Sequence, residues 1–263
     1  MFARELELLS RFVEKAKPPP VLHRYRRASE LTIKELTVPE VHITGVEDMN
    51  DPFEYRAPLR IDIEKLRETF YRFCREQRGM DHDQAKQEAT SLDSNSTALL
   101  HGGIEGLRSN SGLVCCSSDP RSNRMWGYYG DGHKGICIGY NTNFPPFFLA
   151  HQVFYRDPTD SIDLLATLEQ NPSDLADQFS CRKGLEWEFE QEFRIPVGPF
   201  PKDHTRLLPI DPRAIAEIRL GVNISDKFRA DVLKAIKRLP RQPQIYKMGC
   251  DNNTFRLIEN AVS

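Results

Sequence analysis

The sequence lacks the features that assign a chain to several common classes. No apolar run approaches the roughly 20 residues needed to cross a bilayer, and the N-terminal segment carries too many charges for a secretory signal. The formal net charge is only −2, so no overall charge draws the chain to nucleic acid or to anionic membranes. These absences predict a cytoplasmic protein without a membrane partner.

Familiar metal and nucleotide motifs are absent as well. The six cysteines are irregularly spaced and form no C-x-x-C pair, so the sequence gives no support for a structural zinc site. Reduced and mostly buried thiols are expected instead. No G-x-G-x-x-G or P-loop pattern follows an expected strand, which argues against ordinary Rossmann or Walker nucleotide binding. Internal repeats are also missing.

What the chain does contain is a regular interspersion of strand and helix patterns over 263 residues, of which 39% are hydrophobic. Residues 1–20 are predicted to form an amphipathic helix followed by a proline-rich linker, because apolar residues recur at helical spacing before "KPPP". Residues 21–263 are predicted to form a single α+β domain. The helix could make a homodimer or partner contact, or it could pack on its own domain.

The clearest local pattern lies in residues 183–197, "KGLEWEFEQEFRIPV". From Trp187 to Ile195, apolar residues occupy mostly one parity, and three glutamates and an arginine occupy the other, which predicts a strand with one buried face. The residues of the polar face are Glu188, Glu190, Glu192 and Arg194. Two interpretations remain open. The acids could be the solvated side of an edge strand, or they could belong to a functional site.

Four segments together resemble the bacterial family called domain of unknown function 2971. They are "LHRYR" at 22–26, "NDPFE" at 50–54, the long "VCC…IGY" segment at 114–140, and "KGLEWEFEQEFR" at 183–194. Their order and spacing match across roughly residues 21–200. "NDPFE" also has the composition of an Asx turn, so a purely structural role is an alternative for it.

More distantly, the order of residues resembles the ADP-ribosyltransferase superfamily, in which a basic or histidine residue, an aromatic segment and an E-x-E pair follow one another. The resemblance implies a mixed, largely antiparallel, split sheet with flanking helices. It also implies NAD as the substrate, catalysis by Glu192 and Glu190, and a toxin or defence effector with a nucleotide ligand and a macromolecular acceptor. The residues it assigns to NAD binding are Arg24, Arg26, Tyr25, Trp126, Tyr129, His133 and Arg194.

These residue types suit that chemistry. A carboxylate can stabilise the oxocarbenium-like transition state of glycosidic cleavage, arginine can bind a pyrophosphate, and an aromatic ring can stack on nicotinamide. Two other functions remain open. The arginines and aromatic residues could form a pocket for an anionic ligand without catalysis, or Glu188, Glu190 and Glu192 with Asp51 could hold Mg²⁺ in a nuclease or phosphoesterase.

Overall fold

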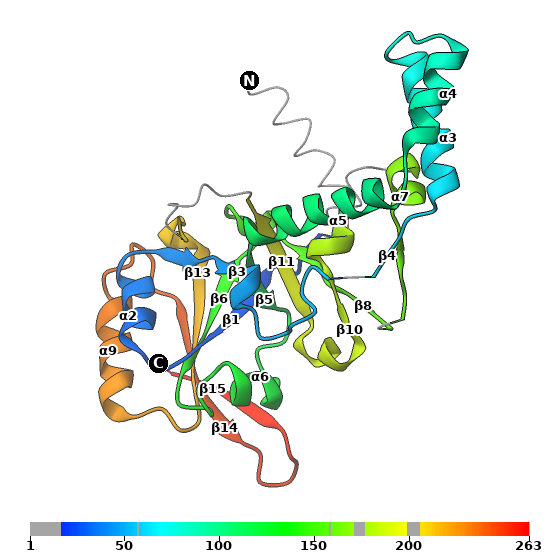
Figure 1. The fold of residues 1–263 in the computed structure, drawn as a ribbon. Helices are drawn as coiled ribbons and strands as arrows, with labels where there is room; N and C mark the ends of the chain where they lie inside the picture. The colour runs from blue at the N-terminus through cyan, green and yellow to red at the C-terminus, as the bar shows by residue number, and fades with distance from the viewer. Residues whose placement is uncertain (1–16, 57, 158, 171–176, 199–205, 263) are drawn as a thin grey trace.

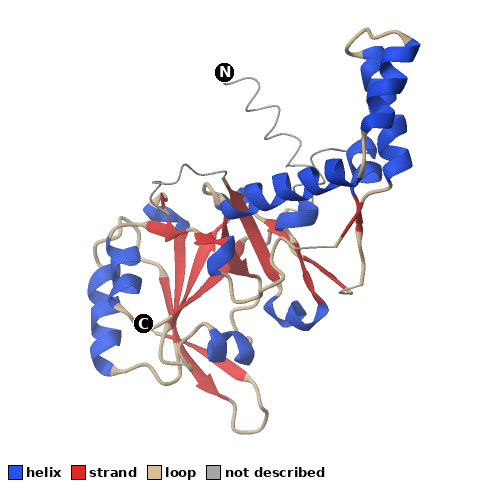
Figure 2. Ribbon diagram, in the orientation of Figure 1, coloured by secondary structure: helices blue, strands red, loops and turns tan. Residues whose placement is uncertain are grey.

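The computed structural model describes residues 17–262 with the exception of 57, 158, 171–176 and 199–205. The expected N-terminal helix therefore lies outside the described residues. From residue 21 onward the chain forms one open sheet with helices on both sides (Figures 1 and 2), which confirms the α+β prediction and the largely antiparallel sheet.

The main sheet contains nine strands among the described residues, in the order β15-β14-β13-β6-β1-β5-β11-β7, with β3 paired to β5. Every pairing is antiparallel except that of β13 with β14. The strands are β1 (Val21–Arg26), β3 (Thr44–Gly45), β5 (Gly112–Ser117), β6 (Ile136–Asn141), β7 (His151–Gln152), β11 (Glu192–Val197), β13 (Ile215–Leu220), β14 (Gln244–Cys250) and β15 (Leu257–Ala261).

Three small two-stranded sheets flank the main one. They pair β2 (Glu40–His42) with β12 (Leu207–Pro209), β4 (Leu59–Arg60) with β9 (Ile162–Asp163), and β8 (Phe154–Arg156) with β10 (Arg182–Gly184). The last pair is parallel, and it brings Lys183 beside the start of β11. This small sheet therefore supplies one charged residue of the site described below.

The helices divide between the two faces of the sheet and a projecting arm. They are α2 (Glu30–Thr37), α3 (Ile63–Glu76), α4 (His82–Ser91), α5 (Ser94–Ser109), α6 (Asn123–Tyr128), α7 (Leu164–Gln170) and α9 (Asp226–Ile236). Figure 1 shows α2 and α9 side by side along one side of the sheet and α3 with α4 extending away from it. Ser29, Ser122 and Ser225 cap α2, α6 and α9 through their hydroxyls, as serine at an N-cap does.

Two apolar clusters fill the space beneath these helices. The larger one packs α2 and α9 against the sheet and contains Leu36, Ile138, Phe193, Ile195 and Val232. The smaller one packs α6 against the opposite face and contains Tyr25, Met125, Trp126, Cys137 and Met248. Side chains alternate between the two faces along each strand, so β1 and β6 contribute residues to both.

The sheet is split between its two central strands. β1 and β5 pair at one position only, His23 opposite Ser117. At the other end of β5, the short strand β3 replaces β1 as the neighbouring strand and pairs with Gly112 and Leu113. Residues Arg24–Arg26 therefore diverge from the middle of β5, and the space between them opens into a cavity.

The prediction of one continuous strand over residues 183–197 was wrong. Residues Leu185–Glu190 form a 3₁₀ helix, Gln191 adopts the left-handed conformation with φ 43°, and the strand β11 begins only at Glu192. The reversal at Gln191 is a tertiary feature, because a non-glycine residue with positive φ must be held by its surroundings. Alternating polarity alone did not reveal it.

Candidate functional site

A cavity with a volume of about 220 Å³ lies in the split between β1 and β5. Its walls come from four parts of the chain: β1, the loop after β3, the end of β5 with α6, and the segment that leads into β11. The polar residues that line it include His23, Arg24, Arg26, Asp48, Asn50, Ser117, Tyr129, Lys183, Glu190 and Glu192. The residues named first and last in the sequence resemblance thus meet at one place.

A buried arginine organises the carboxylates at the back of this cavity. Arg194 is fully buried, and its guanidinium binds Glu54 through two hydrogen bonds, of 2.8 Å from Nη1 and 2.6 Å from Nη2. Nη2 also donates to Oε2 of Glu192 at 2.9 Å, and Nη1 donates to the carbonyl oxygen of Ser180 at 2.8 Å. The bidentate contact fixes the orientation of the Glu54 carboxylate, and the single hydrogen bond holds Glu192 beside it.

Lys183 supplies the second cation. Its Nζ lies 2.6 Å from Oε2 of Glu190, 3.5 Å from Oε1 of Glu54 and 3.6 Å from Oε2 of Glu192. The other oxygen of Glu190 accepts a 2.6 Å hydrogen bond from the hydroxyl of Tyr129, which in turn accepts one from Asn50 at 2.8 Å. We call Glu54, Lys183, Glu190, Glu192 and Arg194 the charge cluster. With all five ionised, three negative charges face two positive ones.

The surroundings shift the pKa values of Glu190 and Glu192, the two catalytic candidates, in opposite directions. Burial alone would raise the pKa of Glu192, but the charges of Arg194 and Lys183 outweigh it and hold this pKa at about 2. Burial, followed by the charge of Glu192, raises the pKa of Glu190 above its usual value despite its hydrogen bonds to Lys183 and Tyr129. A pair of carboxylates with separated pKa values is the arrangement that acid–base catalysis uses.

The backbone around the turn is fixed by polar contacts from neighbouring strands. The hydroxyl of Ser117 donates to the carbonyl oxygen of Glu190 at 2.6 Å, and the backbone N–H of Glu192 donates to the hydroxyl oxygen of Tyr155 at 2.8 Å. Ser117 lies directly opposite Glu192 in the pairing of β5 with β11. The two glutamates therefore reach the cavity from either side of the left-handed residue Gln191.

A second polar chain approaches the cavity from the other half of the sheet. Nε2 of His23 lies 3.3 Å from Oε2 of Glu217, and Arg219 binds Glu217 at 2.6 Å and Glu259 at 2.9 Å. The hydrogen bond from His23, and after it those from Arg219, lower the pKa of Glu217 to about 2. The carboxylate of Glu217 thus orients the imidazole of His23 at the cavity wall.

Of the residues predicted to bind NAD, Arg24, Tyr25, Arg26 and Tyr129 line the cavity. Nη2 of Arg24 donates to the carbonyl oxygen of His42 at 2.7 Å, while its buried Nη1 makes no hydrogen bond within the described residues. The guanidinium of Arg26 is held by Glu35 of α2 at 2.5 Å. Arg24 is therefore the better placed of the two to bind a ligand.

Three other predicted residues do not line the cavity. Trp126 is fully buried in the smaller apolar cluster, where its indole N–H donates to the carbonyl oxygen of Pro120 at 3.0 Å. His133, a residue with φ 67°, stacks on that indole, with ring centroids 6.1 Å apart. Arg194 lies behind the cavity and reaches it only through Glu192. These contacts do not favour direct ligand binding by any of the three.

The alternative of a solvated face carrying Glu188, Glu190 and Glu192 is wrong for two of these residues. Glu188 is exposed, but Glu190 and Glu192 are only 2% and 4% exposed. The edge-strand alternative is also wrong, because β11 lies between β5 and β7 in the sheet. The two glutamates also do not share one face of a strand, since Glu190 ends the preceding 3₁₀ helix.

Sequence reasoning missed Glu54 and Lys183 as site residues, and on β1 it allowed either a histidine or an arginine but named only the arginines and Tyr25. Glu54 belongs to the "NDPFE" segment, where the expected Asx turn is confirmed by the hydrogen bond from the N–H of Phe53 to Asp51 at 2.9 Å. That turn directs the next carboxylate toward Arg194. Lys183 opened the alternating stretch but was assigned no role. Glu54 and Lys183 could have been found as candidates because both lie inside segments that carry the family resemblance.

The comparison with known families agrees with that resemblance over part of the chain. Residues 125–195 match the family described as "Protein of unknown function (DUF2971)", which confirms the predicted family. The matched segment runs from α6 to β11 and contains Tyr129, Lys183, Glu190 and Glu192. No curated protein and no solved structure matches the chain significantly. The family description names no reaction.

No helix within the described residues combines the length and apolarity needed to cross a bilayer.

Proposed function

We propose that the protein cleaves the nicotinamide–ribose bond of NAD, either transferring ADP-ribose to an acceptor or hydrolysing the dinucleotide. The observation that carries the proposal is the pairing of Glu192 and Glu190, with pKa values driven apart, at a cavity in a split sheet. One carboxylate with a lowered pKa and one with a raised pKa at the same cavity suit a reaction that needs both a permanent negative charge and a proton acceptor.

Each residue would have a distinct part in this reaction. The bond between the ribose carbon and the nicotinamide nitrogen breaks with its electron pair moving to the pyridinium nitrogen, which becomes neutral. Glu192, held ionised by Arg194 and Lys183, would stabilise the positive charge that develops on the ribose. Water or an acceptor hydroxyl then bonds to that carbon, and its proton passes to Glu190, whose raised pKa suits a base.

The walls of the cavity supply the groups that would hold such a ligand. Tyr25 and Tyr129 offer aromatic surface, His23 offers a polar ring nitrogen, and Nη1 of Arg24 offers an unused donor. The cavity is smaller than the about 300–1,000 Å³ of sites that enclose drug-sized ligands. We therefore expect it to enclose the nicotinamide and its ribose rather than the whole dinucleotide.

A neighbouring cavity of about 270 Å³ shares Lys183 with the first, and Arg56, Arg156 and Arg182 contribute to its walls. Burial and the nearby positive charge of Arg156 lower the pKa of Arg182. A bound phosphate would offset that repulsion. This cavity is where we expect the phosphates of the nucleotide, or the anionic ligand of a non-catalytic module, to bind.

The test is the release of nicotinamide from NAD, measured by chromatography with the wild-type chain and with Glu192→Gln. The matched control is Glu188→Gln, which changes an exposed glutamate of the same segment. We expect release by the wild type and the control and a loss of at least about 100-fold for Glu192→Gln, the scale of one electrostatic contact to a transition state. Equal release by all three chains would contradict the proposal.

The same preparations separate catalysis from binding. Thermal stabilisation by NAD or ADP-ribose without any nicotinamide release would favour the anionic-ligand module, which the donor Nη1 of Arg24 supports. The Mg²⁺-dependent alternative receives less support. Glu190 and Glu192 are already paired with cations, and the described residues hold no converging set of three ligands at this cavity.

A further inference from the structure

A separate group of side chains converges about one strand away from the charge cluster. His151 lies on β7, Asp177 lies in a helical turn at residues 177–180, and Cys181 follows that turn directly. All three are buried. Their ligand atoms all lie within 4.8 Å of one another, and Nδ1 of His151 is 3.4 Å from Oδ1 of Asp177.

The backbone that carries these residues is anchored independently of any ligand. His151 pairs with Arg194 across β7 and β11. The N–H of Cys181 donates to the carbonyl oxygen of Asp177 at 2.7 Å, and the N–H of Phe154 donates to the carbonyl oxygen of Cys181 at 2.7 Å. The three side chains are therefore held together by the fold, which lowers the ordering cost of binding a ligand among them.

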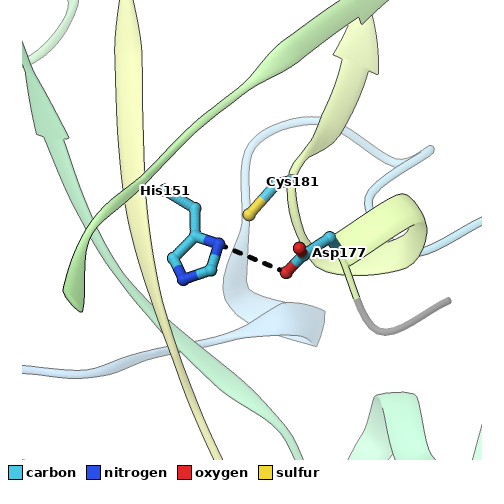
Figure 3. Close-up of side chains that lie close together, drawn as sticks. All are labelled: His151, Asp177 and Cys181. Carbon is cyan, nitrogen blue, oxygen red and sulfur yellow. Dashed lines mark ion pairs between the residues drawn. The ribbon is translucent and has the colours of Figure 1, made fainter. Parts of the chain in front are cut away.

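The direction of the imidazole distinguishes two kinds of site. A Cys–His–Asp catalytic triad uses both ring nitrogens, one toward the thiol and the other toward the carboxylate. Figure 3 shows a different arrangement, in which the ring nitrogen that faces Asp177 also faces the sulfur of Cys181, and the other nitrogen points away. Three donor atoms that face one common point are arranged as metal ligands.

We propose that His151, Asp177 and Cys181 bind one Zn²⁺ ion. Sulfur, nitrogen and carboxylate oxygen form a donor set typical of zinc, whereas Mg²⁺ and Ca²⁺ take oxygen ligands. Zinc bonds of about 2.0–2.3 Å in a tetrahedral site place neighbouring ligand atoms about 3.3–3.8 Å apart. The 3.4 Å separation between Nδ1 of His151 and Oδ1 of Asp177 already has this value, and the sulfur of Cys181 lies within 4.8 Å of the ligand atoms of both.

The charges also balance at such a site. Binding would release the thiol proton of Cys181, and the thiolate with the carboxylate of Asp177 would neutralise the two positive charges of the ion. A water molecule would complete the tetrahedron, since three protein ligands leave one position open. The buried position would then contain a neutral complex in place of separate charged groups, which reduces the electrostatic cost of burial.

The metal would connect the edge strand β7 to the segment that leads to β10. Ser180, next to Cys181, accepts a hydrogen bond from Arg194, and Lys183 follows two residues after Cys181. The ion would therefore fix the segment from which the charge cluster receives one cation and one carbonyl group. Its binding would hold this segment in place, and it does not depend on the reaction proposed above.

The full-length protein, purified from cells grown with added zinc and dialysed without chelator, is to be analysed for metal by mass spectrometry. We expect about one zinc per chain in the wild type and a loss of most of it in His151→Gln and Cys181→Ser. The matched control is Cys74→Ser, because Cys74 is equally buried but lies on α3. Zinc retained equally by Cys181→Ser, or absent from the wild type, would overturn the proposal.

A spectroscopic measurement on the wild-type chain keeps the test valid if the variants do not fold. After removal of metal by a chelator, titration with Co²⁺ should produce a thiolate-to-cobalt charge-transfer band and the visible bands of a tetrahedral ion, and added Zn²⁺ should abolish both. Zn²⁺ should also raise the melting temperature of the metal-free protein. A titration in which no thiolate band develops would overturn the proposal, whatever the variants do.

Discussion

Replacing Arg194 by methionine should destabilise the protein more than any other single charge removal at the site. Methionine keeps much of the length of arginine but removes the cation. It leaves the carboxylates of Glu54 and Glu192 buried, with Lys183 at 3.5 and 3.6 Å as the remaining cation near both. The side chains of Glu54 and Arg194 are both 0% exposed, so water cannot replace the lost partner.

The expected cost follows from that burial. Breaking a buried ion pair by removing one partner costs about 3–5 kcal/mol, because an uncompensated charge remains. For a chain of this size about 1 kcal/mol lowers the melting temperature by about 2–4 °C, so the variant should melt roughly 6–20 °C lower. The assay is urea unfolding, which gives the free energy directly, together with a thermal scan.

Two further variants make this test specific. Arg213→Met removes an exposed arginine that also pairs with an acid, Asp211, and should cost at most about 0.5 kcal/mol. The double variant Glu54→Gln/Arg194→Met removes one negative charge along with the positive one, so it should be more stable than the sum of the two single changes allows. A cost for Arg194→Met below about 1 kcal/mol, or strict additivity in the double variant, would refute the reasoning.

Three other outcomes follow from the same contacts. The folded state holds Glu192 ionised, with a pKa of about 2 against the usual 4.5. Its contribution of about 3 kcal/mol to the free energy of unfolding is therefore present above pH 4.5 and lost as the pH falls toward 2. When that free energy is measured by urea unfolding across this range, it should decrease less steeply with falling pH in Glu192→Gln. Tyr129→Phe removes the hydroxyl that donates to Glu190 and should lower the free energy of unfolding by about 1–3 kcal/mol, with unchanged secondary structure by circular dichroism. Gly135→Ala should destabilise strongly, since its Cβ would lie 2.0 Å from the carbonyl oxygen of Arg26, whereas Gly103→Ala in α5 meets no atom within 4 Å and should be neutral or stabilising in the same thermal scan.

Several elements could be predicted from local pattern because their causes are local. Serine is a residue type that favours a helix N-cap, and α2 begins directly after Ser29. Leu66, Phe70, Phe73 and Cys74 recur at three- and four-residue steps, which is the spacing of one helix face, and they lie on α3. In each case the residues that define the element also determine its hydrogen bonds or its buried face.

The turn before β11 could not be predicted in this way. The alternation of residues 183–197 is genuine, but a 3₁₀ helix and a left-handed residue interrupt the strand that it predicts. Ser117, which is distant in sequence, bonds the carbonyl of Glu190, and Tyr155 accepts from the N–H of Glu192. These long-range contacts favour a local conformation that the sequence pattern alone does not indicate.

By itself, the sequence determined the α+β class and the resemblance to the family, and it singled out Arg24, Tyr129, Glu190 and Glu192. Those inferences rest on periodicity and residue order, which are properties of the chain. The tertiary structure decided that the glutamates are buried and paired with Lys183 and Arg194, that the sheet opens between β1 and β5, and that His151, Asp177 and Cys181 converge. The physical reason is that burial, pKa and metal-binding geometry depend on distances between residues that sequence spacing does not encode.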